Sequence, residues 1–145
     1  MVAAEAKSKA HILIVDDDAL VRRMIRQALL QDKYGAVSEA ADGAAALGKL
    51  EKKGYDIVIT DVRMPAKGGI ELLIEVKRRF PQTAVIVMTG YGDVHTPDEA
   101  RRLGADEYIT KPISAQEIQV IVERVRLRQW LAKKQTRRSG EGSLD

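Results

Sequence analysis

The chain has 145 residues, 45% of them hydrophobic and 31% charged, with a formal net charge of +3 and a pI of about 9.2. This balance is typical of one globular domain. There is no cysteine, which excludes disulfides and thiolate metal sites. The first ten residues lack the apolar core of a signal peptide, and the longest apolar runs are too short to cross a bilayer. We therefore expect a cytoplasmic protein without a membrane segment.

Five short apolar runs, rich in β-branched residues, predict strands at 12–15, 36–37, 57–59, 84–88 and 108–109. Most of these runs do not alternate with polar residues, as is typical of parallel strands covered on both faces. Amphipathic patterns predict five helices, placed around 20–30, 44–50 and 70–76 and opening at 96–99 and 114–117. Asp42 is the expected N-cap of the second helix, and the last two helices open on capping-box sequences. This alternation predicts an α/β fold with a five-stranded parallel sheet and helices on both faces.

Polar side chains stand at the ends of four predicted strands. They are Asp16, Asp17 and Asp18 after the first, Asp61 at the third, Thr89 at the fourth and Lys111 after the fifth. The carboxyl ends of parallel strands share one edge of the sheet, and ligands of such folds bind there. We therefore expect these side chains to converge on a single site.

The predicted site concentrates negative charge. Two carboxylates about 5 Å apart repel by roughly 3 kcal/mol at an effective dielectric of about 20. Lys111 offsets part of this charge, and a hard divalent cation, Mg²⁺ or Mn²⁺, suits the remainder. The absence of cysteine and of a neighbouring histidine argues against zinc. Such a site suits a phosphoryl group, for which the carboxylate of Asp61 is a possible nucleophile.

Two common classes of enzyme are excluded by missing motifs. The chain has no Gly-x-x-x-x-Gly-Lys-Ser/Thr loop, so it is not a P-loop nucleotide enzyme. It also has no Gly-x-Ser-x-Gly elbow, which weighs against an α/β-hydrolase. Neither class of enzyme is therefore expected.

Four segments, in order, resemble a response-regulator receiver domain of two-component signalling. They are residues 12–18 (ILIVDDD), 61–65 (DVRMP), 88–92 (MTGYG) and 104–112 (GADEYITKP). The resemblance covers roughly residues 10–130, and Gly-Tyr-Gly after Thr89 is similar to the receivers of AAA+ transcriptional activators. It implies a flavodoxin-like strand order of 2-1-3-4-5.

The resemblance also implies roles at the metal site. Asp61 would accept a phosphoryl group from a sensor histidine kinase or a phosphotransfer protein. Asp17 and Asp61 would bind Mg²⁺ directly and Asp16 through water, with the backbone carbonyl of Arg63 as a further ligand.

Further roles concern the phosphoryl group and the switch. Lys111 and the backbone at Arg63 and Gly90 would contact the phosphoryl oxygens, and the bond from Lys111 to Pro112 would be cis. Thr89 and Tyr108 would switch inward and alter the face formed by the fourth helix, fifth strand and fifth helix, which controls an output. Arg63 and Tyr91 are large and flank the phosphoryl position, so we expect slow autodephosphorylation. One departure is Gly68, which replaces an acidic residue common in the family.

As a member of this family, the chain would be a phosphoacceptor regulator and not an enzyme. The residues also allow other interpretations. Residues 16–18 fit simple capping of a helix, and Tyr108 fits an ordinary strand-edge residue. The same fold also serves as a phosphorylation-independent scaffold or as a phosphatase, although Val62 and Arg63 after Asp61 lack the second Asp of such phosphatases. The two histidines, His11 and His95, show no ligand partners in the sequence.

The end of the chain predicts a long last helix with two apolar stripes. Ile118, Ile121, Val122 and Val125 suit packing on the sheet, whereas Val120, Leu127 and Leu131 lie on another face. The second stripe, or the face around the fifth strand, suits a homodimer, and an output domain outside this sequence is a further expected partner. The charges at 126–138 are all positive, and we favour a solvated linker over a nucleic-acid reader. The expected organisation is a flexible segment at 1–10, a receiver domain at 11–132 and a basic, disordered tail or linker at 133–145.

Overall fold

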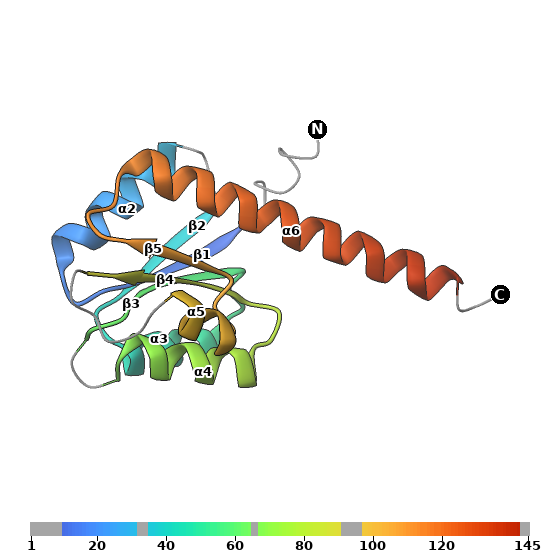
Figure 1. The fold of residues 1–145 in the computed structure, drawn as a ribbon, viewed down its shortest axis with the longest axis horizontal. Helices are drawn as coiled ribbons and strands as arrows, with labels where there is room; N and C mark the ends of the chain where they lie inside the picture. Colours follow the sequence, from blue (N-terminus) through green and yellow to red (C-terminus); the bar gives the residue numbers. More distant parts are fainter. Residues whose placement is uncertain (1–9, 32–34, 65–66, 91–96, 143–145) are drawn as a thin grey trace.

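The chain folds around one parallel sheet (Figure 1). The structure, a computed structural model, describes residues 10–31, 35–64, 67–90 and 97–142, and only the backbone of residues 136–142. Its strands are β1 (His11–Val15), β2 (Ala36–Ala40), β3 (Ile57–Asp61), β4 (Ala84–Thr89) and β5 (Glu107–Thr110). Their order is β2-β1-β3-β4-β5, all parallel. The five predicted strands and the flavodoxin-like order are confirmed.

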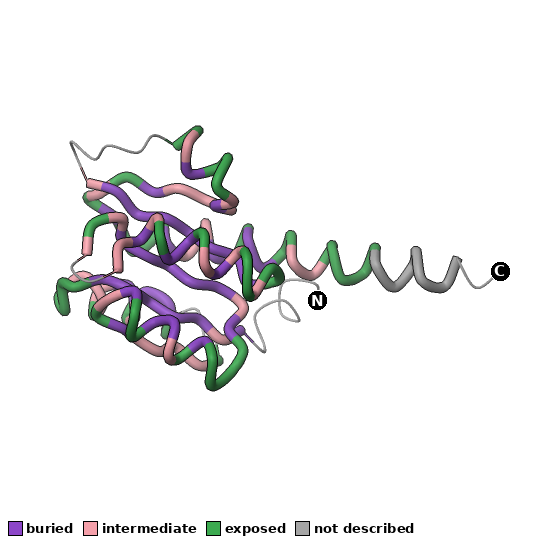
Figure 2. The backbone as a smooth tube through the Cα atoms, turned by 90° about the horizontal axis from the view of Figure 1, so that it is seen from below, coloured by how far each residue is buried: buried purple, intermediate pink, exposed green. Residues whose placement is uncertain are grey.

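Helices cover both faces of the sheet, as predicted (Figure 1). One face packs against α2 (Ala19–Gln31) and α6 (Ala115–Gly142), and the other against α3 (Gly43–Lys52), α4 (Gly69–Arg79) and α5 (Pro97–Arg102). Along β1, Ile12 and Ile14 join the core beneath α2 and α6, while Leu13 and Val15 join the core beneath α3 and α4. Both faces of the strand are therefore buried, which explains why its sequence is apolar throughout. Figure 2 shows the buried strands between partly exposed helices.

Two of the predicted helix starts carry the expected caps. The Asp42 side chain accepts a hydrogen bond from the Ala45 amide at 2.8 Å, and the Ser114 hydroxyl accepts one from the Glu117 amide at 3.1 Å. Each cap satisfies an amide that the first helical turn leaves without a partner. Pro97 is the first residue of α5, but its expected cap, Thr96, lies outside the described residues.

The last helix confirms the two predicted stripes. Ile118, Val122 and Val125 are buried, and Ile121 packs against the same core. Val120, Leu127 and Leu131 are 53%, 41% and 47% exposed, so the second stripe has no cover among the described residues.

The helix is longer than expected. It continues to Gly142 and extends away from the domain (Figure 1), past the boundary that we placed at residue 132. The division into a receiver and a disordered tail stays a prediction. Among the described helices, none is long and apolar enough to cross a membrane.

Candidate functional site

The predicted site residues meet at one edge of the sheet. Asp16 follows β1, Asp61 and Thr89 are the last residues of β3 and β4, and Lys111 follows β5. Because β1 neighbours β3 and β3 neighbours β4, these positions lie side by side. Asp16, Asp61 and Thr89 are buried, which sets them apart from ordinary polar residues at a sheet edge.

Three carboxylates form the acidic cluster of the site: Asp16, Asp17 and Asp61. Each offers one oxygen, and these oxygens lie within 4.8 Å of one another. Asp17 is exposed, which leaves one side of the cluster open to solvent. Three carboxylates and the ammonium of Lys111 leave two negative charges, and a divalent cation with oxygen ligands such as Mg²⁺ matches them. The donor set therefore fits the predicted metal.

Lys111 bridges the two buried members of the acidic cluster. Its ammonium lies 3.2 Å from an oxygen of Asp16 and 3.1 Å from an oxygen of Asp61. The backbone fixes this position, because the Lys111 amide donates to the Thr89 carbonyl at 2.6 Å. The peptide bond to Pro112 is cis, as the resemblance implied. One cation thus serves two carboxylates, from strands that are not neighbours of β5.

Burial and neighbouring charges shift the pKa values of three site residues. Burial, followed by repulsion from Asp16, raises the pKa of Asp61 above its usual value. Burial is also the main reason why the pKa of Asp16 is raised, although Lys111 and the Asp18 amide oppose it. For Lys111, burial alone would lower the pKa, but Asp16 and Asp61 outweigh it and raise the value. Groups whose pKa values are shifted by burial and by neighbouring charges are typical of functional sites.

The residues expected to switch lie on β4 and β5. Thr89 is buried and pairs in register with Thr110. Tyr108 is half-buried, pairs with Val87 and packs against the core beneath α3 and α4. Their inward movement stays a prediction.

Two backbone positions expected at the phosphoryl group follow the strands. Arg63 is exposed after β3, and Gly90 is half-buried after β4. Tyr91, expected to flank the phosphoryl position, and His95 lie outside the described residues. His11 is half-buried at the start of β1, at the opposite edge of the sheet.

Sequence reasoning missed two residues that shape the site. A Cβ on Gly69 would lie 1.9 Å from the Asp61 carbonyl oxygen, so only glycine allows α4 to begin this close to β3. The guanidinium of Arg22 donates to the Asp16 carbonyl at 2.6 Å. Sequence spacing gives no signal for either contact, because both depend on how separate elements pack. Gly68, which replaces an acidic residue common in the family, is the N-cap of α4 and forms no side-chain hydrogen bond to the helix.

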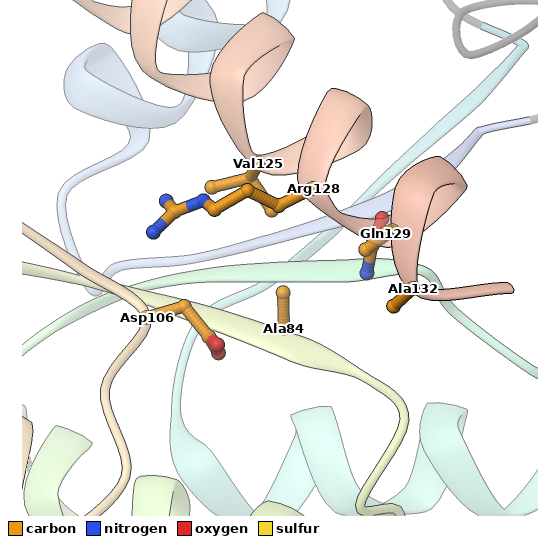
Figure 3. A pocket seen from close by; sticks show the side chains of 6 residues that line it. All are labelled: Ala84, Asp106, Val125, Arg128, Gln129 and Ala132. Carbon is orange, nitrogen blue, oxygen red and sulfur yellow. The ribbon is translucent and has the colours of Figure 1, made fainter. Parts of the chain in front are cut away.

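A cavity of about 240 Å³ lies at the other edge of the sheet, where β4 begins. It is lined by Ala84, Asp106, Val125, Arg128, Gln129 and Ala132 (Figure 3). Its polar side chains already have partners: Asp106 binds Lys77 at 2.8 Å, Arg128 binds Glu107, and Gln129 donates to the Asp56 carbonyl at 2.7 Å. Each of these polar side chains is engaged with another residue of the chain, so we assign no site there.

Comparison with known proteins agrees with this fold. Residues 12–123 match the response regulator receiver domain family. The chain therefore belongs to the receiver domains of two-component response regulators. It is 40% identical over 109 residues to the transcriptional regulatory protein ZraR of Klebsiella oxytoca, covering 75% of this chain and 24% of ZraR. It is also 40% identical over 113 residues to the regulatory protein AtoC of Escherichia coli K12, covering 78% of this chain and 24% of AtoC.

Solved structures give the same result. A receiver domain protein from Clostridium thermocellum superposes with a TM-score of 0.79 at 33% identity, covering 85% of this chain and 98% of that one. NtrX from Brucella abortus superposes with a TM-score of 0.82 at 27% identity, covering 88% of this chain and 29% of that one. The chain thus matches whole receiver domains, but it spans only about a quarter of the length of ZraR and AtoC.

Proposed function

We propose that the chain is a phosphorylation switch in which Asp61 accepts a phosphoryl group from a sensor histidine kinase or a phosphotransfer protein. The observation that carries the proposal is the position of Asp61 in a receiver domain. It is buried at the end of β3, between two further carboxylates and the ammonium of Lys111. Burying these charges destabilises the fold, and a scaffold would not need them, whereas carboxylates perturbed in this way are typical of functional sites.

The transfer needs one displacement at phosphorus. A carboxylate oxygen of Asp61 forms the new P–O bond as the P–N bond of the donor phosphohistidine breaks, and the imidazole nitrogen keeps the electron pair. Loss of the group is hydrolysis, in which water forms a P–O bond, the Asp61 carboxylate leaves and inorganic phosphate is released. Such transfers depend mainly on positioning and on neutralising the oxygens.

The acidic cluster holds the metal in this proposal. Asp17 and Asp61 would hold Mg²⁺ directly, Asp16 would hold it through water, and the Arg63 carbonyl would be a further ligand. When bound, the ion neutralises charge on the cluster and on the phosphoryl oxygens. Lys111 adds its ammonium to those oxygens, which requires it to exchange its ion pair with Asp61 for one with the phosphoryl group. Backbone amides near Arg63 and Gly90 supply further donors.

The output follows from a population shift. The phosphoryl group stabilises the state in which the Thr89 hydroxyl and the Tyr108 ring lie inward, because only that state contacts the phosphoryl oxygens. Thr89 and Tyr108 are on adjacent strands, so their movement changes the face made by α5, β5 and α6. This face controls the output.

Phosphorylation is tested with acetyl phosphate as the donor. The protein is incubated with Mg²⁺ and acetyl phosphate, and its intact mass is compared with that of Asp61→Asn. We expect the unaltered protein to gain one phosphoryl group, and the variant and an EDTA-treated sample to gain none. No gain in the unaltered protein would support a phosphorylation-independent scaffold, and turnover of many donor molecules would support a phosphatase.

The exposed stripe of α6 gives the proposed contact with a partner. Val120, Leu127 and Leu131 are spaced for one face of a helix, which suits a second copy of this helix or an output domain. Replacement of Leu127 and Leu131 by Asp tests the homodimer by analytical ultracentrifugation of the phosphorylated protein. A dimer that persists in this variant would place the contact elsewhere, on the face around β5.

A further inference from the structure

Arg22 crosses from α2 to the backbone of the acidic cluster. It lies on the second turn of α2, and its Nη1 atom donates to the Asp16 carbonyl at 2.6 Å. Its side chain is only 19% exposed, although it is charged and sits beside an open site. The contact is to the main chain and leaves the carboxylates free for other ligands.

A carboxylate from β2 aims the guanidinium. The Nε atom of Arg22 donates to Glu39 at 3.0 Å, while Arg26, one turn further along α2, binds the other Glu39 oxygen at 3.1 Å. Glu39 is therefore shared by two arginines, and one of them, Arg22, also donates to the Asp16 carbonyl. The guanidinium of Arg22 uses two of its donors in a fixed planar fork, a geometry that an ammonium cannot reproduce.

These contacts fix the backbone on both sides of Asp16. The Asp16 amide donates to the Ala40 carbonyl at 3.2 Å, so β2 holds the preceding peptide group. Arg22 holds the following peptide group, which also contains the Asp17 amide. The Asp16 carboxylate is tied in turn to the Asp18 amide at 2.9 Å. Rotation of the peptide that joins Asp16 to Asp17 would break the Arg22 hydrogen bond, so this bond sets the direction of both carboxylates.

We propose that Arg22, aimed by Glu39, is a positioning residue that holds Asp16 and Asp17 in the geometry that binds the metal. The proposal rests on the proposed function, because it assigns Arg22 to the same metal site. Without Arg22, the peptide between the two aspartates gains freedom that must be lost again when the ion binds. Residues that orient metal ligands typically change metal affinity by roughly 10-fold or more when they are replaced.

The test measures Mn²⁺ affinity by water-proton relaxation in Arg22→Ala and Arg22→Lys, with Arg26→Ala as the matched control. We expect the dissociation constant to rise by roughly 10-fold in both Arg22 variants. Arg26→Ala removes an arginine from the same carboxylate but leaves the Asp16 carbonyl contact intact, so its affinity should equal that of the unaltered protein. The Mg²⁺ concentration for half-maximal phosphorylation of Asp61 should rise in the Arg22 variants, while the rate at saturating Mg²⁺ is retained.

A second readout needs no metal. In EDTA, the NMR resonance of the Asp17 amide should shift in Arg22→Ala and not in Arg26→Ala, because that amide shares a peptide group with the Asp16 carbonyl. Unchanged Mn²⁺ affinity in Arg22→Ala, or an equal loss in Arg26→Ala, would overturn the proposal. Normal affinity in Arg22→Lys would overturn the role of the planar fork. Absence of Mn²⁺ binding by the unaltered protein would instead overturn the proposed function, and the amide shift would still show whether Arg22 anchors this peptide.

Discussion

Replacement of Asp61 by Asn should stabilise the metal-free protein. The oxygens of the acidic cluster lie within 4.8 Å of one another, and at that distance each pair of charges repels by about 3.5 kcal/mol at an effective dielectric of about 20. Asp61 takes part in two such pairs. Its attraction to Lys111 at 3.1 Å offsets about 5 kcal/mol of this repulsion at the same effective dielectric. The balance favours the neutral side chain by about 2 kcal/mol, which corresponds to a rise in melting temperature of roughly 6 °C for a domain of this size.

The gain in stability of Asp61→Asn should depend on pH and on the metal. Because folding raises the pKa of Asp61, its charge destabilises the fold above that raised pKa and ceases to do so below the usual value near 3.8. The advantage of Asn should therefore disappear as the pH falls through this window. It should also shrink in Mg²⁺, because the ion stabilises the unaltered protein by binding only its folded state.

Thermal and urea unfolding in EDTA measure the effect. Asp42→Asn is the matched control, since it removes one negative charge but preserves an N-cap, and its stability should stay within about 0.5 kcal/mol of the unaltered protein. A destabilised Asp61→Asn in EDTA would refute the reasoning. It would mean that the ion pair with Lys111 outweighs the repulsion within the acidic cluster.

Two further substitutions examine the surroundings of the cluster. Lys111→Met should destabilise the metal-free protein by about 3 kcal/mol, because it leaves Asp16 and Asp61 buried without their cation; an unchanged urea midpoint in EDTA would contradict this. Gly69→Ala should lower the melting temperature sharply, since its methyl group would lie 1.9 Å from the Asp61 carbonyl oxygen. Gly68→Ala, whose nearest neighbouring atom is at 3.4 Å, serves as its control and should melt like the unaltered protein; equal melting of the two variants would show that the start of α4 can shift.

Local patterns sufficed for the strands and for the convergence of the site. The run at 12–15 is apolar throughout because both of its faces are buried, and a carboxylate directly after such a strand must lie at the edge of the sheet. The neighbours of each strand did not follow from these patterns, and the order came from the resemblance to receiver domains.

Patterns were less informative about which apolar residues are covered. Leu20 and Leu30 helped to predict α2 correctly, yet they are 73% and 50% exposed. Apolar residues are common on protein surfaces, so periodicity locates a helix better than it defines its buried face. The length of α6 was underestimated because the basic residues after 132 have no apolar pattern to continue it.

Contacts between distant elements were beyond the reach of sequence patterns. Glu107 on β5 binds both Arg124, at 2.8 Å, and Arg128 on α6. Arg128 belongs to the run of positive charges at 126–138, which we expected to be solvated. Ion pairs of this kind depend on the final packing of a helix on a strand, which spacing along the chain does not specify.

The continuity of α6 makes it a lever with one end in the core. Val125 is buried against the sheet, and 17 further residues of the helix, up to Gly142, rise by about 25 Å at 1.5 Å per residue. A tilt of about 5° at the sheet would therefore displace the far end by about 2 Å, with no change inside the helix. Spin labels at Lys52→Cys and Gly142→Cys, at the far end of the helix, would detect such a tilt on phosphorylation, and an unchanged distance would exclude it. A small rearrangement beside Glu107 would thus be converted into a larger movement at a point outside the domain.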